Sequence, residues 1–231
     1  MGAGTLINLH THSHFSDGWF SPQEIAARAA EGGLTHVAIT DHFQTSKVPR
    51  CLTSGQMDEY LSAIRNLDRK HDGGLRVLAG VEIDTSPERC DLRSLPVDDL
   101  NRLDLVLFEY VNDEEMGGTM LSELDWLLCR LMVPCGLVHT DIARVFGGIT
   151  PGEVADLLQP YDLFVEVNTA SLYKEKGVPY YERAEEHYRA FKNKVRVSVG
   201  TDVHRLIDEV VNVSKGYRFL ERCDLMDMLL L

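Results

Sequence analysis

Three histidines fall within five residues near the start of the chain, in the stretch LINLHTHSHFSDG (residues 6–18). One residue separates His10 from His12, so both side chains project to the same side of an extended segment. Asp17 follows closely and adds a carboxylate. This pattern predicts a metal site, and a polar turn after a strand is the alternative. His14 lies beside the pair and is a candidate proton donor or substrate contact, or an ordinary loop residue.

Ionisable residues also follow six further apolar stretches of the chain. They are Asp41 and His42, Glu82 and Asp84, Glu109 with Asn112 and Asp113, His139 and Asp141, Glu166 with Asn168, and Asp202 with His204. Mixed imidazole and carboxylate groups suit Zn, Mn or Fe, whereas calcium prefers oxygen ligands alone. One ion takes three or four protein ligands. Because at least seven good ligands are present, we expect two or three divalent ions.

Short apolar stretches precede these residues and predict seven strands. The stretches are 6–9, 36–40, 76–81, 105–108, 136–138, 163–167 and 195–199. They are continuous apolar runs rather than alternating ones, which is typical of parallel strands buried on both faces.

Helical signals fall between the predicted strands. SPQE at 21–24 and TPGE at 150–153 are capping boxes with proline at the first helical position. An apolar face at 57–67, the segment 180–192 and a C-terminal helix ending in LMDMLLL complete the set. The alternation indicates a parallel α/β barrel or an open doubly wound sheet. In a barrel the carboxyl ends of all strands share one face, where sites are built, so the polar residues would converge there.

Composition limits the classes of function. The chain has 231 residues, most simply one domain over 1–231, and a net charge of −13. Such an acidic surface disfavours long nucleic acid and anionic membranes as partners. Five scattered cysteines without a C-x-x-C indicate reduced thiols and predict a cytoplasmic protein. No apolar run approaches the length of a membrane span, and the sequence leaves the oligomeric state unspecified.

The ordered motifs HTHSHFSDG, TDH, GVEI, GLVHTD and GTDVH resemble the PHP (polymerase and histidinol phosphatase) superfamily over essentially the whole chain. Within it, FVEVNTASLYKEKGVPYY followed by VSVGTDVHR is most similar to the histidinol-phosphatase branch. The resemblance implies a distorted (β/α)7 parallel barrel, similar to a TIM barrel, with a trinuclear metal site at the carboxyl ends of the strands. The implied ligand sets are His10, His12 and Asp202 for one ion, Glu82 and His139 for a second that Glu82 bridges to the first, and Asp17, His42 and His204 for the third.

The end of the fourth predicted strand departs from this family pattern. The family often has a histidine there, in a Gly-Ser-x-His setting, whereas this chain reads LFEYVND. Glu109 either replaces that histidine as a ligand, or it points outward or pairs with an arginine. Without a replacement, the second ion would be weakly held or absent.

The resemblance and the ligand set predict hydrolysis of a small phosphomonoester, related to histidinol phosphate, by metal-activated water, with inorganic phosphate as product. Glu82, Asp202 and His14 would act at the reacting centre. Candidate substrate contacts are Arg144, Lys174, Arg205 and Asn168. The alternatives are a nucleotide or oligonucleotide phosphoesterase or exonuclease of the PHP type, an amidohydrolase, and a non-catalytic metal-binding subunit. The chain has no G-x-S-x-G motif and no C-x5-R loop, so no serine or cysteine nucleophile is predicted.

Overall fold

A ring of parallel strands forms the centre of the computed structural model, which describes residues 5–71 and 74–231. Seven strands pair in the order β1-β2-β3-β4-β5-β6-β9. Their bounds are β1 Ile7–Asn8, β2 His36–His42, β3 Arg76–Asp84, β4 Leu105–Glu109, β5 Cys135–Leu137, β6 Phe164–Asn168 and β9 Val197–Gly200. The first and last strands also meet, because the Leu9 N–H donates to the Val199 carbonyl at 2.9 Å. The expected seven-stranded barrel is therefore confirmed, and it is nearly closed.

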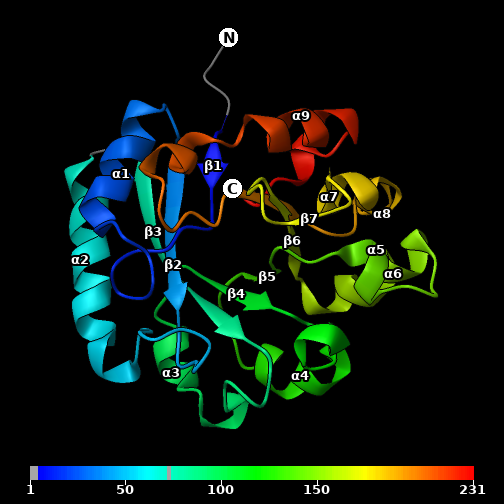
Figure 1. The fold of residues 1–231 in the computed structure, drawn as a ribbon, viewed down its shortest axis with the longest axis horizontal. Helices are drawn as coiled ribbons and strands as arrows, with labels where there is room; N and C mark the ends of the chain where they lie inside the picture. The colour runs from blue at the N-terminus through cyan, green and yellow to red at the C-terminus, as the bar shows by residue number, and fades with distance from the viewer. Residues whose placement is uncertain (1–4, 72–73) are drawn as a thin grey trace.

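Helices surround the ring of strands (Figure 1). They are α1 Pro22–Glu31, α2 Met57–Lys70, α3 Val97–Leu100, α4 Leu121–Leu128, α5 Ile142–Val145, α6 Pro151–Leu158, α7 Tyr180–Arg183, α8 Glu185–Ala190 and α9 Ser214–Arg222. Both predicted capping boxes form, at Ser21 before α1 and at Thr150 before α6. Within the described part of the chain, each helix is too short or too polar to cross a membrane.

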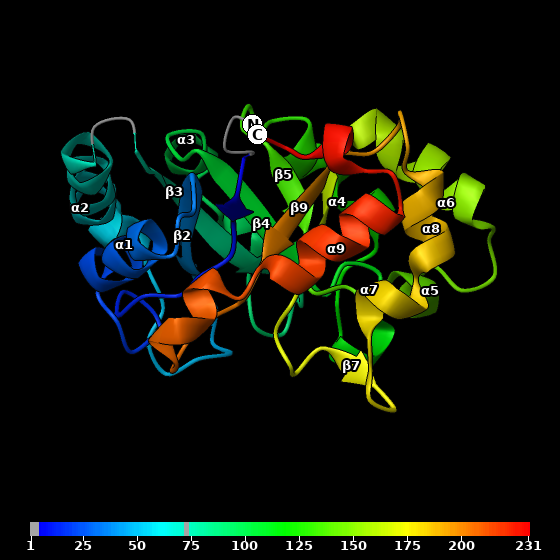
Figure 2. The ribbon, with the colours of Figure 1, turned by 90° about the horizontal axis from the view of Figure 1, so that it is seen from above.

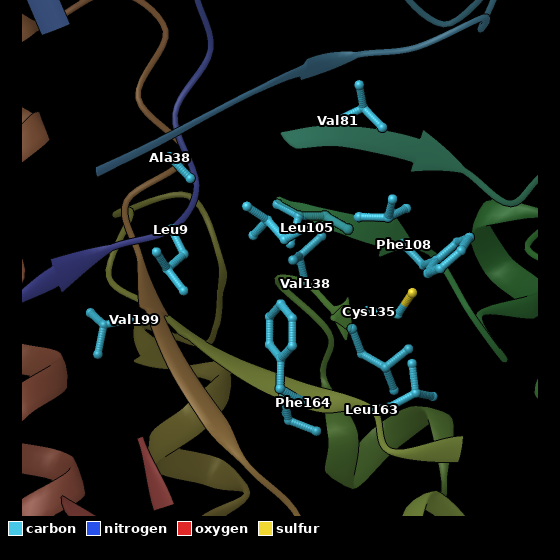
Figure 3. Close-up of a cluster of buried hydrophobic side chains, with 14 of the residues drawn as sticks. Leu9, Ala38, Val81, Leu105, Phe108, Cys135, Val138, Leu163, Phe164 and Val199 are labelled. Carbon is cyan, nitrogen blue, oxygen red and sulfur yellow. The ribbon is translucent and has the colours of Figure 1, made fainter. Parts of the chain in front are cut away.

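The inside of the barrel is filled by apolar side chains from successive strands. Figure 3 shows Leu9, Leu105, Val138 and Phe164 gathered inside the ring, and all four are buried. Gly136 makes room for this packing, because a Cβ atom there would lie 2.1 Å from the Phe164 ring. The interior is thus a packed core rather than a pore, and a site must lie at one of its ends.

Three segments differ from the sequence-based expectation. The predicted helix at 180–192 is two short helices, α7 and α8, which break at Ala184. A hairpin of β7 Lys174–Glu175 and β8 Val178–Pro179 precedes them, and it was not predicted. The C-terminal LMDMLLL is not a helix end, since α9 stops at Arg222. Instead it makes a 3-10 turn at 226–228, and Leu229 then forms an isolated bridge with Val197.

Candidate metal centre

The carboxyl ends of the barrel strands bring the nine predicted ligand residues together. These ends lie on the side that carries the β7–β8 hairpin, opposite the two chain termini (Figure 2). Four overlapping groups form, with the ligand atoms of each group within 4.8 Å of one another: His10, His12 and Asp202; His10, Glu82 and His139; His42, Glu82 and Glu109; and His12, Asp17, His42 and His204. The implied ligand sets are therefore geometrically possible, while their binding of ions stays a prediction.

The first group joins the two ends of the chain. His10 and His12 follow β1 and point the same way, with their Nε2 atoms 3.1 Å apart. Asp202 follows β9, and its Oδ1 lies 3.3 Å from His10 Nε2 and 3.0 Å from His12 Nε2. Three ligand atoms thus surround one point, as a single ion would require.

Glu82 lies at the centre of the cluster because of the register of β2 and β3, which places it directly beside His42. Its Oε2 is 3.0 Å from His42 Nδ1 and 3.4 Å from His12 Nε2. Its Oε1 is 2.8 Å from His139 Nε2 and 3.5 Å from His10 Nε2. One carboxylate therefore contacts four imidazoles, so the implied bridging role is geometrically possible and stays a prediction.

Asp17 forms the third group at the edge of the cluster. Its Oδ1 is 3.3 Å from His204 Nε2 and 3.9 Å from both His42 Nε2 and His12 Nδ1. Its side chain is 28% exposed and that of His204 is 26% exposed, whereas the other side chains of the cluster are at most 7% exposed. This group is therefore the one nearest to solvent.

Glu109 points into the cluster rather than outward. It follows Leu105 and Leu107 on the same face of β4, so strand alternation directs its side chain inward. The side chain is fully buried, with Oε1 3.8 Å from His42 Nδ1 and Oε2 3.6 Å from His139 Nε2. Its partner is Lys47, not an arginine. Glu109 is thus placed where the family histidine is missing.

Burial and neighbouring charges shift the pKa values of the cluster residues in the metal-free protein. Burial, together with His204 and His42, lowers the pKa of His12 to about 3, so its ring is neutral and able to bind an ion. Burial and the charge of Glu82 raise the pKa of Glu109. Four carboxylates share this small volume, and bound cations would relieve their repulsion.

Unpartnered buried atoms test whether metal ions fit. Among the described residues, seven buried side-chain atoms lack a hydrogen-bond partner, and five of them belong to this cluster. They are His12 Nδ1, His42 Nδ1, Glu82 Oε2, Glu109 Oε1 and Asp202 Oδ1. Buried polar atoms are normally satisfied, and leaving them unpaired is costly. In this cluster, unpartnered imidazole nitrogens and carboxylate oxygens lie 3–4 Å apart without hydrogen-bond geometry. Such an arrangement fits divalent ions that take mixed nitrogen and oxygen ligands.

Buried polar residues behind the cluster fix the candidate ligands. Glu166 Oε1 lies 3.0 Å from His10 Nδ1, which turns the Nε2 of His10 toward the cluster. Glu166 Oε2 accepts the His139 N–H at 2.8 Å and the Asn168 amide at 2.9 Å. Asn168, predicted as a substrate contact, therefore lies behind Glu166 and outside the cavity wall. Asp41 similarly accepts hydrogen bonds from Ser13 and Ser16 in the ligand loop.

Two candidate ligands have left-handed backbone conformations. His139 has φ of 35° and Asp202 has φ of 47°. Such values are uncommon for residues other than glycine, and they cluster at functional sites where the surroundings hold them in place. At His139, the bond from its own N–H to Glu166 provides that support.

A cavity of about 930 Å³ opens above the cluster. Arg144, Lys174 and Arg205, which the sequence suggested as substrate contacts, all line it. His14 does not, because its exposed ring turns away and stacks on Phe15 at 4.9 Å. The predicted catalytic role of His14 therefore has no support in the geometry.

Two lining residues, Lys47 and Tyr173, were missed by sequence reasoning. Tyr173 precedes β7, stacks on His139 at 4.4 Å and donates its hydroxyl to Asp202. Lys47 lies in the loop after β2. Both residues are on irregular segments where no periodic pattern indicates the direction of a side chain. A weak signal for Tyr173 was its position shortly after the Glu166-x-Asn168 strand end.

Comparisons with known proteins agree with this arrangement. A family model described as the PHP domain matches residues 8–159. The chain is 28% identical over 202 residues to the DNA polymerase/3'-5' exonuclease PolX of Bacillus subtilis (strain 168). The aligned region covers 86% of this chain and 34% of that protein. The chain thus spans about a third of the length of this curated relative.

Solved structures share the fold. The histidinol phosphate phosphatase HisK of Lactococcus lactis, in complex with zinc, L-histidinol and phosphate, aligns with a TM-score of 0.68 and 18% identity, covering 96% of this chain and 94% of that one. The hisK protein of Listeria monocytogenes aligns with a TM-score of 0.62 and 16% identity, covering 92% and 98%.

Proposed function

The chain belongs to the PHP domain family, and from that premise we propose that it is a metal-dependent hydrolase of small phosphomonoesters. The observation that carries the proposal is the group of five unpartnered buried atoms on Glu82, Glu109, Asp202, His12 and His42. Glu82, Asp202 and His42 also line a cavity large enough for a phosphate and a leaving group. The zinc and phosphate in the structurally similar HisK complex support the same assignment.

We propose that the chain holds two or three divalent ions. His10, His12 and Asp202 would bind one ion, Glu82 and His139 with Glu109 a second, and Asp17, His42 and His204 the third. The donor set suits Zn, Mn or Fe. When bound, such ions supply Lewis-acid activation of the phosphoryl group and of the attacking water.

The protein's own residues would position the reaction. Glu166 fixes the His10 ring and the backbone of His139, so the ligands need little rearrangement when an ion or substrate binds. Tyr173 stacks on His139 and would limit water access from that side. Lys174 and Arg205 line the cavity and would meet a negatively charged substrate there, and inorganic phosphate would leave by the same opening.

Hydrolysis of p-nitrophenyl phosphate tests the proposal. Protein stripped with a chelator should be inactive, and Mn or Zn should restore activity. Asp202→Asn should lower kcat by at least about 100-fold, since it removes a carboxylate from the reacting centre. Asp208→Asn, an exposed residue paired with Arg28, is the matched control and should keep full activity. Metal-independent hydrolysis, or no hydrolysis across a panel of phosphorylated metabolites, would refute the proposal.

A nucleotide or oligonucleotide phosphoesterase is the second candidate, because the PolX relative is an exonuclease. The net charge of −13 disfavours long nucleic acid, though not a mononucleotide or a short 3' end. Digestion of a labelled single-stranded oligonucleotide, run beside the phosphatase assay, distinguishes the two. Faster turnover of the oligonucleotide than of any small monoester would favour this second candidate.

A further inference from the structure

Lys47 brings a positive charge to the edge of the candidate metal cluster. Its ammonium contacts Glu109 Oε2 and lies 4.9 Å from the centre of the Tyr110 ring. The side chain is 28% exposed and lines the main cavity. One face of the ammonium is therefore fixed by protein, and the other faces the space where substrate would bind.

The Lys47 ammonium can donate to more than one partner. A lysine is protonated at neutral pH, because its ordinary pKa is about 10.4. An ammonium has three N–H donors. Glu109 accepts a hydrogen bond from this ammonium, and the Tyr110 hydroxyl is close enough to be a second partner. At least one donor therefore remains for a ligand in the cavity.

The arginines of the cavity are committed elsewhere or lie farther out. Arg144 forms ion pairs with Asp113 and Glu115. Arg205 stacks over the exposed Trp19 ring at the rim, 5.4 Å from its centre. Lys47, by contrast, contacts a carboxylate that is itself part of the cluster.

We propose that Lys47 binds a phosphoryl oxygen of the substrate and that Glu109 holds its ammonium in position. This inference rests on the proposed function and adds a non-metal cation to it. A phosphomonoester is largely dianionic at neutral pH, and lysine binds phosphate as a compact point charge. The competing explanation is that Lys47 only neutralises the buried Glu109.

A double-mutant comparison separates these two roles. Lys47→Met is made in the natural chain and in Glu109→Gln, where no charge is left to neutralise. Lys47→Arg keeps the charge, and Lys194→Met removes a lysine paired with Asp156 before β9, at the other end of the barrel. For each metal-loaded protein, calorimetry measures inorganic phosphate binding and elemental analysis measures metal content. Inhibition of p-nitrophenyl phosphate hydrolysis by phosphate gives an independent value.

A direct contact predicts that Lys47→Met weakens phosphate binding about 10- to 100-fold in both backgrounds, the usual effect of losing a charged hydrogen bond. Metal content should not fall with Lys47→Met, Lys47→Arg should retain part of the affinity, and Lys194→Met should have no effect. The proposal is overturned if Lys47→Met has no effect in the Glu109→Gln background. If Lys47→Met does not fold in the natural chain, two comparisons of phosphate affinity decide. One compares Glu109→Gln with and without Lys47→Met, and the other compares Lys47→Arg with the natural chain.

The same measurements distinguish failure of this inference from failure of the proposed function. A protein that binds phosphate through Lys47 but hydrolyses no monoester would refute the proposed function alone. A protein that hydrolyses monoesters with unchanged phosphate binding in the lysine variants would refute the role of Lys47 alone. If the natural chain neither binds phosphate nor hydrolyses monoesters, both are wrong.

Discussion

Two replacements of Asp41 should show whether its hydrogen bonds to the first ligand loop or its negative charge contributes more to stability. Asp41 is fully buried at the end of β2. Its Oδ1 accepts the Ser13 N–H at 2.8 Å, the Ser16 N–H at 3.1 Å and the Ser16 hydroxyl at 2.6 Å, and its Oδ2 accepts the Ser13 hydroxyl at 2.6 Å. These bonds fix the loop between His12 and Asp17.

The loss in Asp41→Ala follows from these contacts. The Ser13 N–H would become an unpaired buried donor, which costs about 1–3 kcal/mol. The Ser16 N–H keeps a second acceptor, the Ser13 carbonyl at 3.1 Å. Each serine hydroxyl loses a bond worth about 1 kcal/mol. We expect a total loss of about 3–5 kcal/mol, or about 6 to 20 °C in Tm for a domain of this size.

Asp41→Asn should be much milder. Burial raises the pKa of Asp41, although the bonds from Ser13 and Ser16 act in the opposite direction. The negative charge is therefore disfavoured in the fold relative to water. A neutral amide of the same shape keeps the acceptor at Oδ1, and the Ser13 hydroxyl can rotate to accept from the new N–H. We expect a loss of about 1 kcal/mol or less.

Urea unfolding of metal-stripped protein, followed by tryptophan fluorescence, measures both variants. Asp208→Ala is the control, because this carboxylate is 87% exposed and its pairing with Arg28 should contribute at most about 0.5 kcal/mol. Equal destabilisation by alanine and asparagine would refute the reasoning, since the charge rather than the hydrogen bonds would then be decisive. An unchanged free energy of unfolding in Asp41→Ala would refute it as well.

Three further predictions follow from the same geometry. Gly200→Ala places a Cβ 1.8 Å from Glu166 Oε1 and should lower both Tm and metal content. Gly152→Ala is the control, because its Cβ would meet open space and should change neither. Equal effects of the two substitutions would contradict this prediction. Against the effect of burial, Asp17 raises the pKa of His204 to about 9 from 6.5. This stabilisation is present below pH 6.5 and is lost as the pH rises to 9. The free energy of unfolding of metal-stripped protein should therefore fall by about 1–3 kcal/mol over this range, and His204→Gln should abolish that fall. Chelation should lower Tm, and added Mn or Zn should raise it with concentration; a Tm insensitive to metal would argue against resident ions.

The fold and most of the cluster could be predicted because they depend on strand periodicity. Apolar runs identified the seven strands, and residues such as His42 and Glu82 continue those runs directly. The carboxyl ends of parallel strands must meet at one face, so convergence followed without knowledge of the loops. For Glu109 the same alternation decides between the two predicted orientations in favour of the inward one.

The remaining residues lie in segments whose path depends on tertiary contacts. Lys47 and Tyr173 reach the cavity through a loop and a hairpin with no apolar period. His14 lies in the loop bonded to Asp41, where it is exposed and does not line the cavity, so its catalytic role stays a prediction without geometric support. Asn168 is on a strand, yet its amide is taken by Glu166. Direction of a side chain in a loop is thus set by hydrogen bonds to distant residues, which one sequence does not reveal.

The closure of the barrel between β1 and β9 also has a consequence for biosynthesis. Asn8 donates to Thr201 across a separation of 193 residues, and the group of His10, His12 and Asp202 joins the same two ends of the barrel. Contacts so distant in sequence form late, because nearly the whole chain must be ordered first. During translation, this ligand group cannot be complete until β9 and the Asp202 that follows it have left the ribosome. Metal loading of that group should therefore come after the synthesis of β9, and a nascent chain lacking β9 should not retain that ion.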